Sequence, residues 1–310
     1  MAHRGPVQTA ARHLVLMADN PQSTGRGRFL CAIGAILAVF LAASLAAYFA
    51  GRPYIGAWAS LALFVMTLSS GVLVAQGFYA LEGLYEQCGR DLDAGEIAAR
   101  LRAGQSAPRP FVLYLRPFAS TDAMAETQTR AVRIDTGTAH LAISTNRLEF
   151  ESQIEKAARA FGTMVGLGEP LEHEGAGRIE VDDTDWQALV EKLMNQARLI
   201  ILLPSPTGGT RWEVSQLLAS NLMTKTIVID PPNRASDRQD YDPVDEWNHT
   251  IEIFQAEGYT LPPDAPDGQL VYFGEHRTPQ DIAKLSLDDV QQMRRFMKRA
   301  VANAAAAQPR

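Results

Sequence analysis

The chain has 310 residues, with 29 basic and 35 acidic side chains and a formal net charge of −6. This acidic balance argues against a DNA- or RNA-binding groove, which needs a basic surface, so we expect no nucleic-acid partner. Two cysteines and scattered histidines offer neither a disulfide framework nor a metal-ligand spacing, so no metal site is predicted.

The first part of the chain predicts a membrane anchor. Residues 1–28 are small and polar and predict a tail, whereas 29–50 and 54–81 contain no charged side chain. Each of these two segments is long enough to cross a hydrocarbon layer of ~30 Å. Because only Gly51-Arg52-Pro53 separates them, we predict a transmembrane helical hairpin over 29–81. A cleaved secretory signal is the alternative, but the second apolar segment disfavours it.

The arginines predict the orientation of this hairpin. Arg26 and Arg28 precede it and several arginines follow it, whereas the turn carries only Arg52. Cytoplasmic flanks are the richer in basic residues, so both termini are expected in the cytoplasm. The lipid bilayer is therefore one expected partner.

After the hairpin, residues 82–110 predict a juxtamembrane helix and a linker, and residues 111–310 predict an α/β domain. Short apolar runs bounded by glycine, proline or charge predict five strands. They are Phe111–Leu115, Thr163–Leu167, Leu199–Leu203, Lys225–Ile229 and Leu270–Phe273. Helical patterns alternate with them, which predicts a flavodoxin-like parallel five-stranded sheet with helices on both faces.

Capping pairs and apolar stripes predict where the helices begin. The pairs are Asn146 with Glu149, Thr184 with Gln187 and Thr210 with Glu213. Further helices are predicted over 244–256 and from near Thr278 and Ser286. Residues 118–145 fit no regular element and predict either a functional loop or a hairpin.

The turn after the third predicted strand is the main candidate site. Gly208 and Gly209 would let a ligand approach the backbone, and the following helix would direct N–H groups at phosphate or ribose oxygens. Thr210 and Trp212 would contact the same ligand. Glu213 would place a carboxylate beside a ribose whose anomeric carbon becomes positive during N-glycosidic cleavage, so Glu213 is the predicted catalytic residue.

A structural explanation of the same residues is equally open. Thr210 and Glu213 have the spacing of a capping box, in which each side chain binds the other residue's backbone N–H. Trp212 would then only pack.

Three residues elsewhere complete the candidate ligand site. Arg116 follows the first strand, Arg178 ends a Gly-Ala-Gly-Arg sequence, and Asp230 follows the fourth strand. Either arginine could meet a phosphate, and Asp230 could meet a ribose or purine. The alternatives are a surface ion pair for Arg116, a solvated loop charge for Arg178 and a turn cap for Asp230.

The sequence VLYLRPF and the strand, Gly-Thr turn and Trp-bearing helix at 199–218 resemble the Toll/interleukin receptor (TIR) domain and its bacterial relatives. The Gly-Thr-x-x-Glu pattern is also similar to nucleoside deoxyribosyltransferases and to phosphoribohydrolases of the lysine-decarboxylase-like family. A group of uncharacterised bacterial two-span membrane proteins shares the LYLRPF, GAGR-like and Thr-x-Trp-Glu features. The resemblance covers about residues 111–273.

The resemblance implies a flavodoxin-like sheet in a signalling protein of the bacterial inner membrane that hydrolyses NAD at the nicotinamide bond through a glutamate. NAD would be a substrate, with no cofactor required, and the domain would form homo-oligomers. TIR domains usually place the glutamate three residues after the tryptophan, where this chain has Ser215, and their early aspartate would here be Asp122. A non-catalytic signalling or self-association module of the same fold is the alternative.

Overall fold

The computed structural model describes residues 83, 85–116, 125–129, 145–171, 174–182, 185–204, 208–232 and 243–307. The tail and both predicted transmembrane segments lie outside these residues, so the hairpin stays a prediction. Among the described residues, no helix combines the length and the apolar character needed to cross a bilayer. The chain divides into two compact units, 1–89 and 90–310, and the second unit carries the α/β domain.

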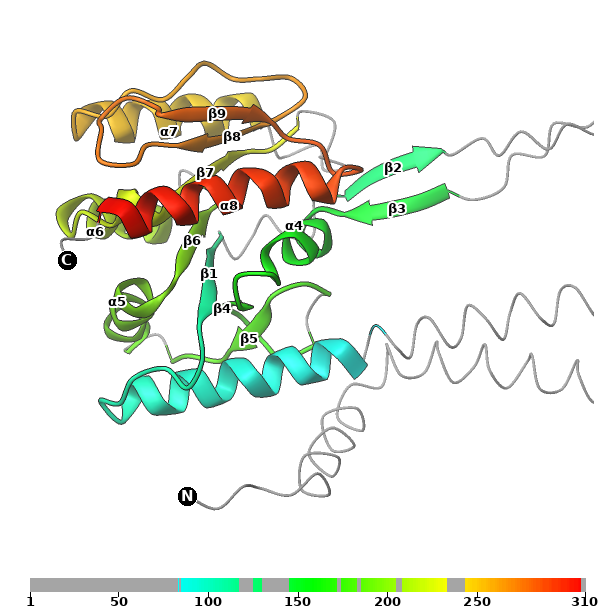
Figure 1. Ribbon diagram of the computed structural model, residues 1–310, viewed down its shortest axis with the longest axis vertical. Helices are drawn as coiled ribbons and strands as arrows, with labels where there is room; N and C mark the ends of the chain where they lie inside the picture. The colour runs from blue at the N-terminus through cyan, green and yellow to red at the C-terminus, as the bar shows by residue number, and fades with distance from the viewer. Residues whose placement is uncertain are drawn as a thin grey trace, which may run out of the picture. The chain divides into compact units, whose positions relative to one another are not determined.

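A seven-stranded mixed sheet forms the centre of this unit, in the order β5-β4-β1-β6-β7-β8-β9 (Figure 1). The first five strands in this order are parallel, whereas β8 and β9 run antiparallel to their neighbours. The strands are β1 Phe111–Leu115, β4 Thr163–Leu167, β5 Gly177–Ile179, β6 Leu199–Leu202, β7 Thr226–Asp230, β8 Gln269–Tyr272 and β9 Asp281–Lys284.

The α/β class is confirmed, but the expected five-stranded, all-parallel sheet is wrong in strand number and in direction. The five predicted strands lie in the order β4-β1-β6-β7-β8, which is consistent with a flavodoxin-like arrangement. The fifth of these, β8, is antiparallel to β7. β5 and β9 extend the two edges.

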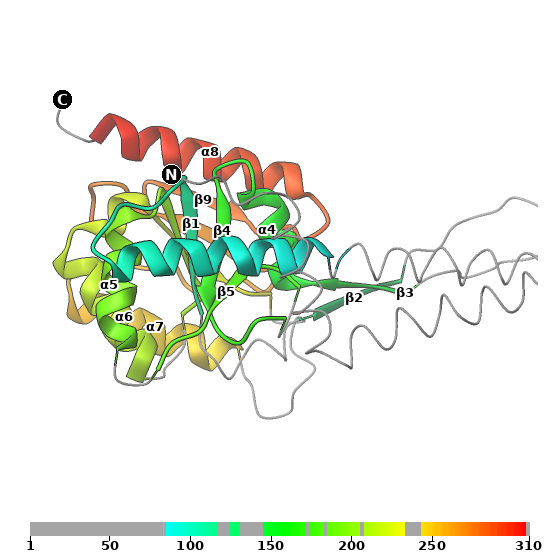
Figure 2. The ribbon, with the colours of Figure 1, turned by 90° about the horizontal axis from the view of Figure 1, so that it is seen from below.

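Helices cover both faces of the sheet, as predicted (Figure 2). One core contains Phe150 of α4 and Phe296 of α8, which pack against Val112 and Tyr114. The other contains Leu113 and residues of α5, α6, α7 and the helix over residues 85–102. The labelled helices are α4 Phe150–Ala158, α5 Trp186–Gln196, α6 Gly208–Ala219, α7 Pro243–Ala256 and α8 Val290–Ala307, with a short 3-10 turn, η2, at Leu222–Lys225.

Alternation along β1 explains why the central strands are continuous apolar runs. Successive side chains of a strand point to opposite faces, and here each face has its own core. All five residues of β1 are buried. The core that contains Leu113 also includes Ala94, Ile97 and Leu101, so the segment predicted as a juxtamembrane helix contributes to the domain interior.

Part of the segment that fitted no element forms a two-stranded antiparallel sheet, of β2 Ala125–Thr129 and β3 Thr145–Glu149. The predicted cap at Asn146 is therefore wrong, because Asn146 lies within β3 and α4 begins only at Phe150. The helix predicted near Thr278 is also wrong, because Asp281–Lys284 pairs with β8 as β9. The last predicted helix exists, but it begins at Val290 and not near Ser286, because Asp289 Oδ1 accepts the Gln292 N–H at the start of α8.

Candidate functional site

The carboxyl ends of β1 and β6 mark the place where the chain connections change side. From β1 the chain proceeds to β4 on one side, and later to β6 on the other. Open α/β sheets bind ligands outside the carboxyl ends of the strands at such a switch point. Arg116 follows β1 directly, Glu213 lies on α6, the helix after β6, and Asp230 is the last residue of β7. Three of the predicted site residues thus lie toward this edge.

Glu213 is buried, with 6 % of its surface exposed. Its Oε2 atom is inaccessible to solvent and has no hydrogen-bond partner within the part of the chain that the structure describes. Burial without a compensating charge disfavours the ionised carboxylate, which raises the pKa of Glu213 to about 8. The side chain therefore holds a proton at neutral pH and can act as a hydrogen-bond donor.

The predicted capping box does not form. The helix α6 begins at Gly208, so Thr210 lies inside its first turn and not at the N-cap position. Thr210 is itself buried. A capping box would leave the Glu213 carboxylate bonded to backbone N–H groups, whereas Oε2 is without a partner. The capping-box explanation for Glu213 is therefore wrong.

The two glycines of the turn have room beside them. Among the described residues, which exclude 205–207, a Cβ atom built on Gly208 or Gly209 would meet no atom within 4 Å. A ligand can therefore approach this backbone more closely than it could approach the packed glycines elsewhere in the domain. Trp212 is half-buried and contacts Trp186 edge-on, with the ring centroids 4.9 Å apart. Packing is thus one role of Trp212.

Arg116 and Arg178 come together around one carboxylate that was not predicted. Arg178 Nη2 lies 2.8 Å from Glu151 Oε1, and Arg116 Nε lies 3.8 Å from Glu151 Oε2. All three side chains are buried. The predicted surface ion pair at Arg116 and the solvated loop charge at Arg178 are both wrong, because the two arginines belong to a buried ionic cluster. We call Arg116, Glu151 and Arg178 the Glu151 cluster.

The Gly-Ala-Gly-Arg sequence is built around this cluster. The Ala176 N–H donates to Glu151 Oε1, and a Cβ atom on Gly175 would overlap the Glu151 side chain. A Cβ atom on Gly177 would overlap the carbonyl oxygen of Arg90, in the helix over residues 85–102. Asp91 in the same helix accepts the N–H groups of Leu171 and Arg178. The contacts therefore explain this motif by packing.

Asp230 is held in place by the segment that precedes β8. Its Oδ2 accepts the Ala265 N–H at 3.0 Å and the Gln269 side-chain N–H at 2.9 Å. Burial, with a smaller contribution from the nearby Asp264 carboxylate, raises the pKa of Asp230 and the two hydrogen bonds lower it, which leaves a net pKa of about 7. These contacts favour the turn-capping role, although Oδ1 remains without a hydrogen-bond partner.

Sequence reasoning missed Glu151 and Asp91, although Glu151 left a signal. Ile154 and Ala158 lie on the apolar stripe of α4, and Glu151 stands at the preceding position of the same stripe. A carboxylate in an apolar stripe predicts a buried partner, because an unpaired buried charge is costly. Asp91 gave no comparable signal.

Among the described residues, no cluster of three histidine, cysteine or acidic side chains could hold a metal ion. No family model, no curated protein and no solved structure matches this chain. The site must therefore be interpreted from its own geometry.

Proposed function

We propose that the α/β domain binds a ribose-containing nucleotide, with NAD as the first candidate, at the carboxyl edge beside Glu213, and hydrolyses its N-glycosidic bond. The observation that carries this proposal is Glu213 itself: a buried carboxyl group with a partnerless oxygen at the switch point of the sheet. Structures rarely retain such a group without a reason, because it destabilises the fold. The open space beside Gly208 and Gly209 supports the same location.

The reaction needs the ionised form of Glu213, and the bound substrate can supply the charge that favours this form. In the reaction, the bond between ribose C1′ and the nicotinamide nitrogen breaks, and its electron pair leaves with nicotinamide. Water adds to C1′, and the proton that it loses is released to solvent. The oxidised nicotinamide ring is a cation and C1′ becomes positive, so the bound substrate would favour the ionised form of Glu213. A carboxylate in a site of low dielectric would then stabilise the transition state strongly.

The membrane tether predicted over 29–81 is part of this proposal. The domain would work at the cytoplasmic side of a bacterial inner membrane. Confinement to a plane raises the local concentration of the domain, which favours activation by self-association.

The test is nicotinamide release by the full-length chain in nanodiscs. We expect release by the wild type, little or none by Glu213→Gln, and wild-type release by Glu252→Gln, an exposed glutamate on α7 that serves as the matched control. No release at high protein concentration would contradict hydrolysis. Equal release by the wild type and Glu213→Gln would contradict the role of Glu213.

A second candidate function is a non-catalytic signalling or self-association module, and the burial of the site favours it. Glu213 is only 6 % exposed, and Arg116, Arg178 and Asp230 all contact protein groups. This module would neither release nicotinamide nor be stabilised by NAD. Light scattering of the chain in nanodiscs of increasing protein content would then reveal assembly without turnover.

A further inference from the structure

The outward faces of α4 and α8 carry an excess of positive charge. The helix α8 has four basic side chains and no acidic one among its 18 residues. The helices α4 and α8 lie against each other, and Arg294 on α8 donates to the backbone oxygen of Lys156 at 2.7 Å. We call the six cations of this surface the α4–α8 basic face. They are Lys156, Arg159, Arg294, Arg295, Lys298 and Arg299.

Three carboxylates neutralise part of this face. Glu155 lies 2.8 Å from Arg159, Asp281 lies 2.7 Å from Arg299, and Asp289 lies 3.8 Å from Arg295. Within the part of the chain that the structure describes, no carboxylate lies in ion-pair distance of Lys156, Arg294 or Lys298. The face therefore keeps a positive excess in a chain whose net charge is −6.

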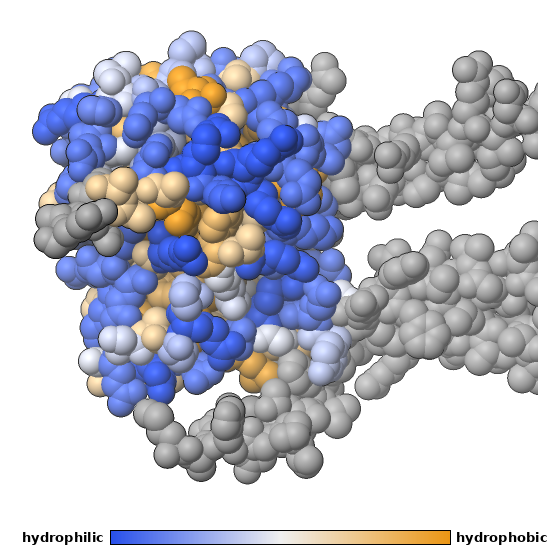
Figure 3. All heavy atoms as spheres, in the orientation of Figure 1, coloured by the Kyte–Doolittle hydropathy of each residue, from blue (hydrophilic) through white to orange (hydrophobic). Residues whose placement is uncertain are grey.

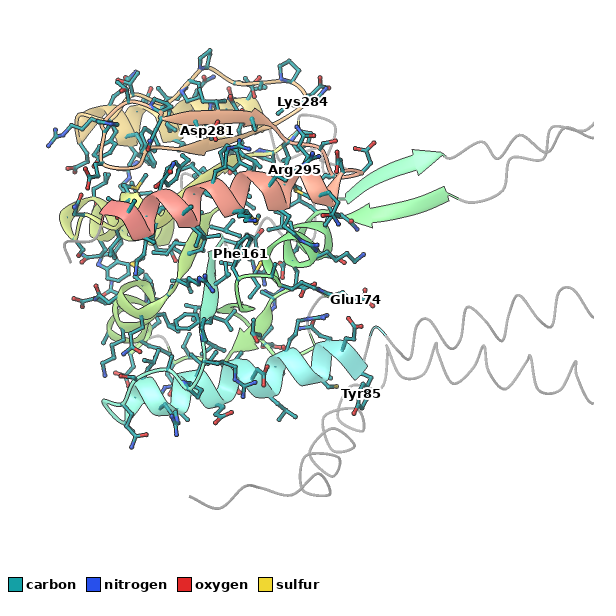
Figure 4. All side chains as sticks on the ribbon, viewed as in Figure 1. Tyr85, Phe161, Glu174, Asp281, Lys284 and Arg295 are labelled. Atoms are coloured by element: carbon teal, nitrogen blue, oxygen red, sulfur yellow. The ribbon has the colours of Figure 1, made fainter. Side chains whose placement is uncertain are left out.

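Apolar residues beneath α8 hold most of these cations on the surface. Met293, Phe296, Met297 and Ala300 fill the buried side of α8, so Arg295, Lys298 and Arg299 face outward, whereas Arg294 is half-buried. Arg295 is 70 % exposed and Arg299 is 54 % exposed. Figure 3 shows hydrophilic side chains over the first half of α8, and Figure 4 shows Arg295 on its outer side.

We infer that the α4–α8 basic face binds the surface of an anionic phospholipid bilayer. A cluster of lysines and arginines on an amphipathic helix binds acidic headgroups by charge, without a shaped pocket. The choice of lipid over other polyanions rests on the proposed membrane tether, which would hold the domain within reach of headgroups at a high local concentration. The acidic remainder of the chain disfavours a nucleic acid that would extend beyond the face.

The test compares the reactivity of individual lysines in the full-length chain. The protein is placed in nanodiscs of phosphatidylcholine alone, or of phosphatidylcholine with about 30 % phosphatidylglycerol as the anionic lipid. A membrane-impermeant amine reagent then labels exposed lysines, and mass spectrometry measures each rate. Lys284 is the internal control, because it is 63 % exposed, pairs with Asp267 and lies on β9 at a position that points away from the α8 side of the sheet.

We expect Lys156 and Lys298 to react about threefold or more slowly in the anionic discs than in the neutral discs, while Lys284 reacts equally in both. Salt at about 1 M should remove the difference, because it screens charges beyond about 3 Å. The double substitution Arg295→Glu and Lys298→Glu should abolish protection of Lys156, whereas Lys284→Glu should preserve it. Both variants alter exposed side chains, so equal thermal unfolding will verify that the fold is retained.

Flotation with neutral vesicles separates this inference from the membrane tether. If the chain floats with neutral vesicles but Lys156 and Lys298 are labelled equally in both kinds of disc, the α4–α8 basic face does not bind lipid. The membrane tether would still be supported. A chain that does not float with neutral vesicles, but whose Lys156 and Lys298 are protected by anionic ones, would support the face and contradict the tether. Protection by DNA or polyglutamate, and not by anionic vesicles, would overturn the inference in favour of another polyanion.

Discussion

Glu151 and Glu213 are both less than a tenth exposed, but the protein surrounds them in opposite ways. Glu151 lies between two arginines and also accepts a backbone N–H. Glu213 has a partnerless oxygen, and burial raises its pKa to about 8. One carboxylate is compensated by fixed positive charge and the other by a proton. Glu151 therefore helps to stabilise the fold, whereas the burial of Glu213 lowers the stability of the fold.

The largest expected effect is that of Glu151→Gln. The substitution keeps the shape of the side chain but removes the negative charge between Arg116 and Arg178. Breaking a buried ion pair in this way leaves uncompensated charge and costs about 3 to 5 kcal/mol. We expect a loss of this size in the free energy of unfolding, measured with urea on the purified full-length chain.

Asp267→Asn is the matched control for this prediction. It removes one carboxylate of an ion pair with Lys284 in which both side chains are more than half exposed. Exposed pairs contribute only about 0.2 to 1 kcal/mol. Equal losses for Glu151→Gln and Asp267→Asn would show that the Glu151 cluster is not the framework we describe.

The same chemical change at Glu213 should have the opposite sign. The folded protein keeps the proton of Glu213 up to about pH 8, whereas the unfolded chain releases it near the ordinary value of 4.5. Between these values the unfolded state binds fewer protons, so stability falls as the pH rises, by about 1.4 kcal/mol for each pH unit. The glutamine variant avoids this loss.

We therefore expect Glu213→Gln to unfold like the wild type near pH 4.5 and to be more stable than it by about 4 kcal/mol at pH 8. Urea unfolding of both proteins across this range measures the difference. Glu252→Gln, on the exposed side of α7, should follow the wild-type curve. Parallel curves for the wild type and Glu213→Gln would mean that burial does not raise the pKa of Glu213. A glutamine variant less stable than the wild type would mean that Glu213 has a charged partner, as Glu151 has. A gain in stability together with a loss of nicotinamide release would identify a residue kept for function.

The sequence predicted the strands of the domain better than its site, for a physical reason. The four central strands are buried on both faces, so their residues must be continuously apolar, and such runs are visible without a structure. The edge strands are different. Gly177–Ile179 is only three residues long, and Asp281–Lys284 has alternating exposure and reads as polar. The direction of β8 depends on how its connection returns, which no local pattern encodes.

The site was harder to predict because its contacts are distant in the sequence. Glu151, Arg116 and Arg178 meet only after β1, α4 and β5 have assembled. The position of Glu213 could be predicted from the apolar strand and the glycines before it, but its burial could not. The spacing of Thr210 and Glu213 matched a capping box. The helix begins at Gly208, however, so Thr210 lies inside its first turn and cannot serve as the N-cap.

The glycines on the two sides of the carboxyl edge of the sheet also differ in their packing. On the side of the Glu151 cluster, a Cβ atom on Gly177 would overlap the Arg90 carbonyl oxygen, whereas no described residue lies within 4 Å of a Cβ atom on Gly209. We expect Gly177→Ala to lower the free energy of unfolding by about 1 to 3 kcal/mol, because the helix over residues 85–102 must shift. Gly209→Ala should instead raise it by up to about 1 kcal/mol, because alanine favours a helical backbone.

Urea unfolding measures both changes in stability. Binding of NAD then distinguishes a residue that supports the fold from one that contacts the ligand. Gly177 lies in the framework, so Gly177→Ala should weaken binding of NAD only as far as it unfolds the chain. Gly209→Ala should leave the fold intact but add a methyl group where the proposed ligand approaches the backbone, which should weaken binding without a loss of stability. If Gly177→Ala were tolerated and Gly209→Ala were destabilising, the assignment of one side to framework and the other to ligand would be reversed. If both were stable and bound NAD equally, the space beside Gly209 would not be the nucleotide site.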